Sequence, residues 1–139
     1  DSRLVGKPDD RFVSTSRQAL KGAIAAAIPG HRIGHISQAM QQIIQKNGYS
    51  SVTQYCGHGI GRALHEDPQI FCYVAEPIPK TMLIQEGMTL AVEVMMNEGR
   101  SEVVIDPNGW HSHTADKSRS AQFEHTILVT DKGPQILTP

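Results

Sequence analysis

Three side chains that could bind a metal ion interrupt segments that otherwise resemble β-strands. They are His58 in the glycine-rich segment 56–61, Glu93 in the apolar segment 87–94 and Glu124 in segment 120–129. A carboxylate in the middle of a buried strand is costly unless something neutralises it. Because carboxylates and imidazole are donors that divalent metals take, the three residues predict a divalent metal site. For one isolated glutamate, pairing with arginine or lysine, or exposure to water, is the simpler interpretation.

Side chains alternate between the two faces of a strand, and this alternation sets each glutamate apart from its neighbours. Glu93 shares one face of residues 89–95 with Ala91 and Met95, whereas the other face is wholly apolar. Glu124 shares one face of residues 121–129 with Gln122, Thr126 and Leu128, opposite Phe123, His125, Ile127 and Val129. If the two strands are neighbours in one sheet, Glu93 and Glu124 converge on one point.

Two histidines in this part of the chain are candidates for chemistry. His58 lies between Gly57 and Gly59, which allow close backbone approach and unusual dihedral angles beside an imidazole. The alternative is a turn in which the histidine is incidental. His65, seven residues later, is a candidate second-shell base, hydrogen-bond donor to a substrate, or surface cap.

Further along the chain, one tryptophan and a histidine pair invite weaker interpretations. Trp110, the only tryptophan, is expected in the core by default and otherwise in the wall of an apolar pocket. His111 and His113 form a His-x-His pair, but no glutamate follows at the spacing that a cupin-type site needs. We therefore expect both histidines on the surface.

Length and composition fit one folded domain and exclude several classes of protein. The chain has 139 residues, of which 39% are hydrophobic and 19% charged, enough for a core of useful size. A formal net charge of -1 gives no reason to expect direct nucleic-acid binding, and no apolar run is long enough to span a bilayer. Two cysteines are too few for a disulfide framework and indicate a reducing cytoplasm.

Periodicity predicts two helices followed by a turn-rich sheet. The first helix is expected to begin near residues 7–10, with Asp9 or Asp10 as its cap, and to end at Pro29-Gly30. The second is expected at about 34–47, after which the pattern becomes strand-like. The expected strands are 52–56, 88–95, 101–105, 110–114, 121–130 and 135–138, and residues 66–87 are expected to form a long ordered loop. This order indicates a single α+β domain over residues 1–139.

Three motifs together resemble one known family. Segment 55–68 reads Tyr-Cys-Gly-His-Gly-Ile-Gly-Arg-Ala-Leu-His-Glu-Asp-Pro and resembles the signature of type I methionine aminopeptidases. Segments 87–93 and 120–126 are similar to the family's two later ligand segments. The resemblance extends over essentially the whole chain, in order. Arg62 and the run 56–61 favour type I over type II and over the proline-specific relatives.

The resemblance implies a fold, an activity and a role for each residue. It implies the C-terminal half of the pita-bread fold, with two helices packed on an antiparallel curved sheet. It implies a cytoplasmic enzyme that removes the initiator methionine from nascent proteins with two divalent ions, which are cobalt, manganese, iron or zinc. His58 and Glu93 resemble ligands of one metal and Glu124 the bridging ligand. His65 and Glu93 resemble the catalytic residues. His65, Trp110 and Leu64 resemble the substrate-binding residues.

The chain also departs from the family pattern. The two aspartate ligands belong to the family's first half, and Asp1 falls a few residues after the second aspartate's place. Leu64 stands where the family usually has an aromatic residue, and Val94 where it usually has proline.

The expected partners are nascent polypeptides that begin with methionine, and possible further ones are the ribosome and either a complementary half or a second copy. The competing hypothesis is a non-catalytic module that binds a nascent chain, a ribosome or a partner protein.

Overall fold

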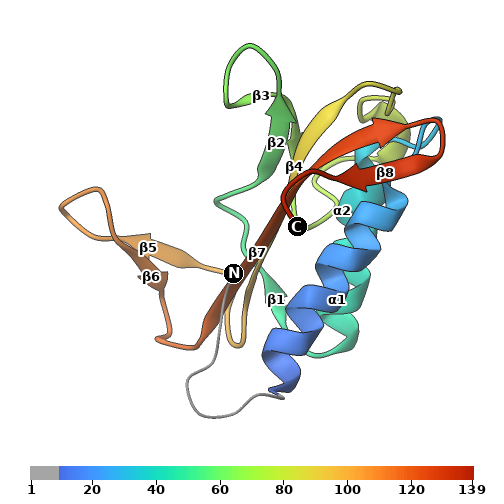
Figure 1. Ribbon diagram of the computed structural model, residues 1–139. Coiled ribbons are helices and arrows are strands. Elements are labelled where there is room, and N and C mark those ends of the chain that lie inside the picture. The colour runs from blue at the N-terminus through green and yellow to red at the C-terminus, as the bar shows by residue number, and fades with distance from the viewer. Residues whose placement is uncertain (1–9) are drawn as a thin grey trace.

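The computed structural model of the protein describes residues 10–139, which form two helices followed by an antiparallel sheet (Figure 1). The helices are α1 (Arg11–Ala26) and α2 (Ile33–Lys46), and a short 3-10 helix, η1 (Ile78–Lys80), follows later. The strands are β1 (Ser50–Ser51), β2 (Gly57–Ile60), β3 (Glu66–Ile70), β4 (Thr89–Asn97), β5 (Val103–Ile105), β6 (Ser112–Thr114), β7 (Ser120–Thr130) and β8 (Gly133–Ile136). The part of the expected helix start that falls on residues 7–9, including Asp9 as a candidate cap, lies outside the described residues. No helix among residues 10–139 is long and apolar enough to cross a membrane.

Both helices form where the sequence period predicts them. Asp10 is the N-cap of α1, because its carboxylate accepts a hydrogen bond from the Phe12 backbone N–H at 2.7 Å. In α2 the first helical residue is Ile33, one position earlier than expected, and Asn47 is the C-cap. Gly48 follows with φ of +80°, a left-handed conformation that glycine adopts at little cost.

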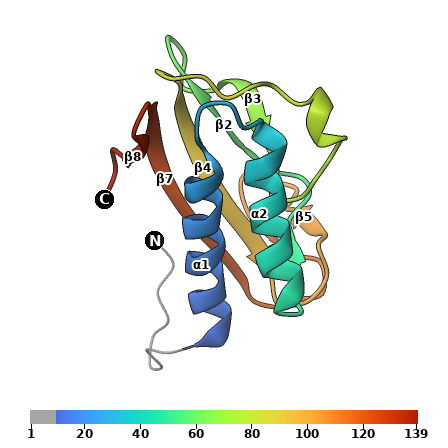
Figure 2. The ribbon, with the colours of Figure 1, turned by 90° about the vertical axis from the view of Figure 1, so that its right-hand side faces the viewer.

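The strands build an antiparallel six-stranded sheet in the order β3-β2-β4-β7-β8, with β1 also paired to β4. The strands β5 and β6 form a separate hairpin. Figure 2 shows α1 and α2 side by side over one face of the sheet, and Figure 1 shows the β5–β6 hairpin standing out on the other side. The fold class predicted from the sequence is therefore confirmed.

The core lies between the helices and one face of the sheet. Alternate residues of β4 supply much of it, since Leu90, Val92 and Val94 are at most 1% exposed. Ile36 and Met40 from α2, both fully buried, belong to the same cluster. This packing leaves the intervening β4 side chains on the face of the sheet that the helices do not cover.

Two strand predictions were wrong for identifiable reasons. The strand expected at 52–56 is instead β2, in the glycine-rich segment that follows it. A Cβ at Gly57 would lie 2.4 Å from the Ala91 carbonyl oxygen, so glycine is what allows β2 to pair closely with β4. The loop expected at 66–87 begins with β3, an edge strand, where Pro68 is tolerated because its nitrogen has no neighbouring strand to serve.

One charged network links the residue before β7 to the start of α1. The Arg119 guanidinium donates to Glu98 at 2.7 and 2.8 Å and also bonds the Asp10 carboxylate. Its guanidinium carbon lies 5.2 Å from the centre of the Phe12 ring, a cation–π distance. The hydrogen bond from Arg119 is the largest cause that lowers the pKa of Asp10, followed by the Phe12 N–H. Arg119 thereby joins the strand that carries Glu124 to the cap of α1.

Candidate metal centre

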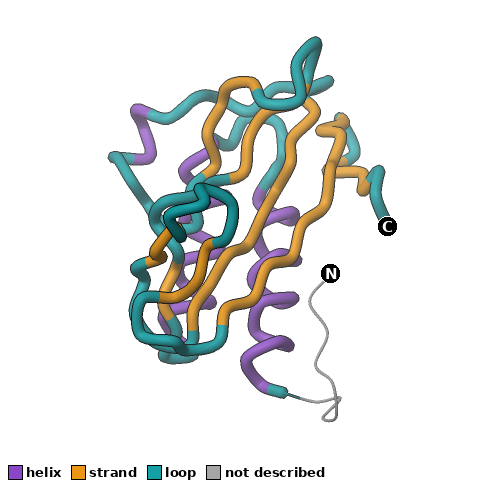
Figure 3. Tube along the Cα trace, turned by 90° about the vertical axis from the view of Figure 1, so that its left-hand side faces the viewer, coloured by secondary structure: helices purple, strands orange, loops and turns teal. Residues whose placement is uncertain are grey.

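Three neighbouring strands bring the predicted metal ligands to one face of the sheet. β4 lies between β2 and β7, and Glu93 is directly opposite Glu124 in the β4–β7 register. His58 is opposite Ala91, which shares its face of β4 with Glu93. This is the face away from α1 and α2, visible in the tube view of Figure 3. The condition for convergence, that the two glutamate strands are neighbours, is met.

His58 and Glu93 form the most enclosed part of this face. The His58 Nε2 atom lies 3.7 Å from Glu93 Oε1, and the two side chains are 13% and 12% exposed. The His58 Nδ1 atom is 2.9 Å from the Gly59 carbonyl oxygen, so we assign the N–H to Nδ1. That tautomer leaves the Nε2 lone pair pointing toward Glu93, as in a metal-binding histidine oriented by a backbone carbonyl.

Burial is the main cause that raises the pKa of Glu93, and the facing carboxylate of Glu124 raises it further. His58 and the Gln122 side chain act in the opposite direction. The Gln122 amide donates to Glu93 Oε2 at 3.1 Å. Two facing carboxylates and an imidazole nitrogen are a donor set that fits a divalent cation. Among residues 10–139, however, no three His, Cys, Asp or Glu side chains are gathered as a ready metal-binding group.

The two cysteines near this face do not contribute a thiolate. Burial raises the pKa of Cys72 to about 12. Its thiol donates a hydrogen bond to the Glu93 carbonyl oxygen and its sulfur accepts one from the Met95 N–H, both at 3.3 Å. Burial also raises the pKa of Cys56. Both thiols therefore stay protonated at neutral pH, and the chemistry of the face rests on carboxylates and imidazoles.

His65 lies beside His58 on this side of the sheet. The two imidazole centroids are 4.3 Å apart, with the rings inclined at 60°, and His65 is exposed. It lies within a turn in which the Glu66 carboxylate accepts from the Ala63 N–H at 2.7 Å. Leu64, in the same turn, is 67% exposed and has no core role.

Trp110 is not in the core, and this default expectation was wrong. It is 86% exposed and lies in the loop of the β5–β6 hairpin, away from the body of the domain (Figure 1). The Asn108 side chain holds this loop by accepting from the N–H groups of Trp110 and His111 at 2.9 and 3.2 Å. His111 and His113 are on the surface, as expected, close to the Asp106 carboxylate.

Gln122 is the residue near Glu93 to which the sequence analysis gave no role. It follows the alternation that places it on the same face as Glu124, and this alternation was the available signal. Its amide fixes one oxygen of Glu93 and leaves the other oxygen near His58. An amide donor at this point partly offsets the negative charge of the two glutamates.

Comparison with known proteins places these motifs in a wider group. The profile of metallopeptidase family M24 matches residues 3–131. A methionine aminopeptidase of Escherichia coli K12 is 40% identical over 138 residues, which is 97% of this chain and 52% of that protein. One from Aquifex aeolicus is 37% identical over 134 residues, covering 96% of this chain and 52% of that protein. The chain thus spans about half the length of the curated relatives it matches.

Solved structures are similar over nearly the whole chain. The methionine aminopeptidase of Thermotoga maritima matches with a TM-score of 0.91 and 42% identity, covering 98% of this chain and 55% of that one. A prolidase from Pyrococcus furiosus matches with a TM-score of 0.72 and 25% identity, covering 99% of this chain and 35% of that one. These pita-bread proteins share the arrangement of two helices on an antiparallel sheet.

Proposed function

Since this chain belongs to metallopeptidase family M24, we propose that it is the C-terminal half of an aminopeptidase that removes methionine from the N-terminus of new polypeptides. Relatives named methionine aminopeptidase, about 40% identical over most of the chain, support this substrate class. The observation that carries the proposal is Glu93 facing Glu124 across β4 and β7, beside the imidazole of His58.

His58, Glu93 and Glu124 would hold the metal. A metallopeptidase family implies divalent ions, and the proposal specifies two, of cobalt, manganese, iron or zinc. When bound, such ions polarise a carbonyl and lower the pKa of water. The remaining ligands would come from two aspartates in a complementary half, which accords with the absence of a closed three-residue group among residues 10–139. The same complementary half, or a second copy, would cover the open face of the sheet, which is the face that carries His58, Glu93 and Glu124.

The chain's other residues on this face would orient the substrate and move a proton. Glu93, held by Gln122 at one oxygen, would take a proton at its other oxygen and pass it to the leaving amine. His65 would donate a hydrogen bond to the oxygen of the scissile carbonyl, where negative charge develops. Leu64 and Trp110, both strongly exposed, would form part of the wall around the methionine side chain. Nascent chains, and the ribosome that presents them in the cytoplasm, are the proposed partners.

The test compares this chain with a version extended by its upstream half. Both are loaded with manganese or cobalt, their metal content is measured by mass spectrometry, and methionine release from a Met-Ala-Ser peptide is followed. We expect the extended version to release methionine at least roughly 100-fold faster than the chain alone, because a complete ligand set is needed. Glu124→Gln should abolish release, whereas Glu102→Gln, a 59% exposed glutamate outside the site, should not.

Two outcomes would contradict the proposal. If the extended version binds metal but releases no methionine, the chain is a non-catalytic module of the same fold. If the chain alone is fully active and Glu124→Gln inactivates it, the other half contributes no essential ligand.

A further inference from the structure

A cavity lies at the start of α2, apart from the face of the sheet that carries the predicted metal ligands. Its volume is about 230 Å³, and its walls come from α2, β3 and the segment around η1. None of these elements carries His58, Glu93 or Glu124. Drug-sized ligands occupy pockets of roughly 300–1,000 Å³. This cavity is therefore suited to a group of a few non-hydrogen atoms.

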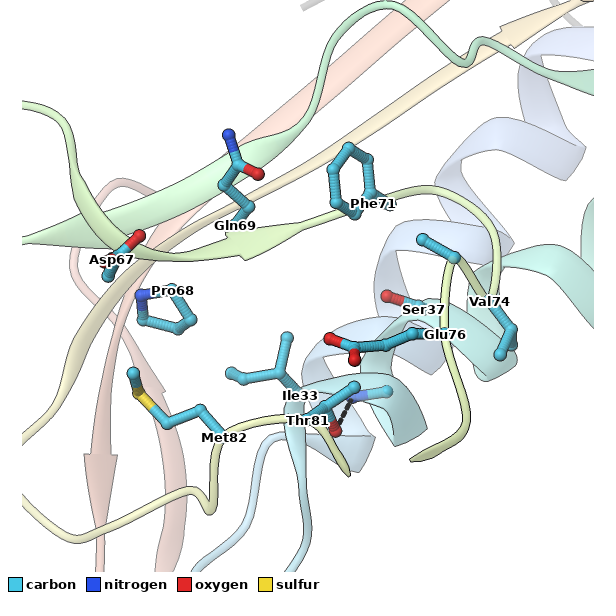
Figure 4. Close-up of a pocket in the computed structure, with 12 residues that line it drawn as sticks. Ile33, Ser37, Asp67, Pro68, Gln69, Phe71, Val74, Glu76, Thr81 and Met82 are labelled. Carbon is cyan, nitrogen blue, oxygen red and sulfur yellow. Dashed lines mark hydrogen bonds between the residues drawn. The ribbon is translucent and has the colours of Figure 1, made fainter. Parts of the chain in front are cut away.

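The inside of the cavity is mostly apolar. Ile33, Pro68 and Met82 direct their side chains into it, as the close-up in Figure 4 shows. The Gln69 amide and the Phe71 ring, which also border it, point away from it (Figure 4). An alkyl group placed between Ile33, Pro68 and Met82 would lose its contact with water on most sides.

Two polar groups converge on this apolar space. Ser37 is only 4% exposed, and its hydroxyl makes no hydrogen bond with any residue from 10 to 139. In Figure 4 this hydroxyl points into the cavity, and the Glu76 carboxylate points toward the same space. Glu76 forms no ion pair within the described residues. Ser37 Oγ is not among the fully buried oxygens that lack a hydrogen bond within residues 10–139, which are Ser16 Oγ and Asn97 Oδ1, so it is open to the cavity and can bond a ligand there.

The charge of a group that this cavity would bind follows from the backbone N–H groups that already donate hydrogen bonds. In the first turn of α2, the Ile33 N–H donates to the Met82 carbonyl and the Gly34 N–H to the Thr81 hydroxyl, both at 3.0 Å. The His35 N–H donates to the Arg32 carbonyl at 2.9 Å. These three donors are therefore not available for an anion, whereas the Glu76 carboxylate and the Ser37 oxygen can both accept. The cavity favours a cation.

We infer that this cavity binds a primary ammonium group on a short alkyl stem. The ammonium would donate to Glu76 and Ser37, and the stem would lie between Ile33, Pro68 and Met82. An ammonium is a compact charge with three rotatable donors, which suits acceptors from two separate elements better than a planar guanidinium does. The group could belong to a free amine or to a lysine side chain, since both present the same chemistry.

The direct test is titration of the 139-residue chain with n-butylammonium chloride at low salt, followed by amide proton–nitrogen NMR. We expect shifts confined to residues that line the cavity, with a Kd on the order of 1 mM, as befits so small a ligand. Neutral n-butanol should bind at least roughly tenfold more weakly, because it lacks the charge-assisted hydrogen bond to Glu76. Equal binding of the alcohol, or shifts spread over the whole surface, would overturn the inference.

Variants separate the two polar groups from general effects of charge. Glu76→Gln should weaken n-butylammonium binding roughly tenfold, and Ser37→Ala should weaken it by a few-fold. Glu86→Gln removes an exposed carboxylate that does not line the cavity and should leave the Kd unchanged. Each variant's own spectrum reports whether it is folded. An unchanged Kd in a folded Glu76→Gln variant would show that the cavity does not recognise the ammonium.

The source of the ammonium is resolved by a second pair of ligands. A capped lysine peptide is compared with the same peptide carrying norleucine in place of lysine. If the lysine peptide binds at least as tightly as n-butylammonium, and the norleucine peptide does not bind, a side chain can enter. If only the free amine binds, the ligand is a small molecule. If neither binds, the inference is wrong.

Discussion

The two faces of β4 share one backbone but have different surroundings. Leu90, Val92 and Val94 face the helices and are at most 1% exposed. Glu93, between two of them, faces the other way, toward His58 and Glu124. One face gains free energy from apolar burial, whereas the other holds two like charges close together at a cost in stability. The strand therefore carries residues that stabilise the fold on one face and residues that reduce its stability on the other.

The comparison would break if a truncation on the helix face had no larger effect than one on the open face. Leu90→Ala should lower the free energy of unfolding by about 3 kcal/mol, because it leaves a cavity in a fully packed site. Leu128→Ala, on the open face and partly exposed, should cost about 1 kcal/mol. Chemical denaturation measures both, and equal losses would mean that the open face is also a packed core.

Divalent metal should stabilise the protein through the open face alone. At a concentration tenfold above its Kd, a metal that binds only the folded chain adds about 1.4 kcal/mol. We expect manganese, cobalt or zinc to raise the melting temperature of the wild type and of Glu102→Gln. The increase should disappear in Glu124→Gln. A melting curve that no metal shifts would count against the assignment of the ligands.

The open face should also make stability depend on pH without metal. Because the pKa of Glu93 is raised above its ordinary value of 4.5, the folded state favours the protonated acid. This contribution is fully present below pH 4.5 and is lost as the pH rises through the folded pKa. At pH 8, Glu93→Gln should therefore be more stable than the wild type, by about 1 kcal/mol or less. The difference should vanish at low pH. A difference that is constant from pH 4 to 8 would contradict the prediction.

The smallest effect is expected at Trp110. Since its side chain is 86% exposed, Trp110→Ala should change the free energy of unfolding by no more than about 0.5 kcal/mol. If the proposed role in substrate binding is correct, the same change in the extended version should raise KM for a methionine peptide. A loss of several kcal/mol in the chain alone would mean that Trp110 packs in solution.

The sequence predicted the helices and the alternation of the strands well, because both depend on local period. The Asp10 cap and the Asn47 stop follow from residues next to the helix ends. The faces on which Glu93 and Glu124 lie follow from the alternation of side chains along a strand. That these strands are neighbours could not be derived in this way, since the β5–β6 hairpin lies between them in the chain.

The errors lie where a neighbour far along the chain decides the structure. Gly57 and Gly59 made their segment look unsuitable for a strand, yet they are needed because β4 and β3 approach so closely. The hydrophobicity of Trp110 predicted burial, although its place in a projecting hairpin decides its exposure. The position of Ser37 beside Glu76 is equally non-local, because they lie on α2 and on a loop that crosses it.

The Arg119 network has a consequence for the timing of synthesis. The residues Asp10 and Arg119 are 109 positions apart, although they are bonded in the fold. At about 5–20 residues per second, a ribosome needs from about 5 to about 20 s to reach Arg119 after making Asp10. For that interval the start of α1 has its local cap, but neither the ion pair nor the cation–π contact. The first helix therefore gains its contacts with Arg119 only late in synthesis.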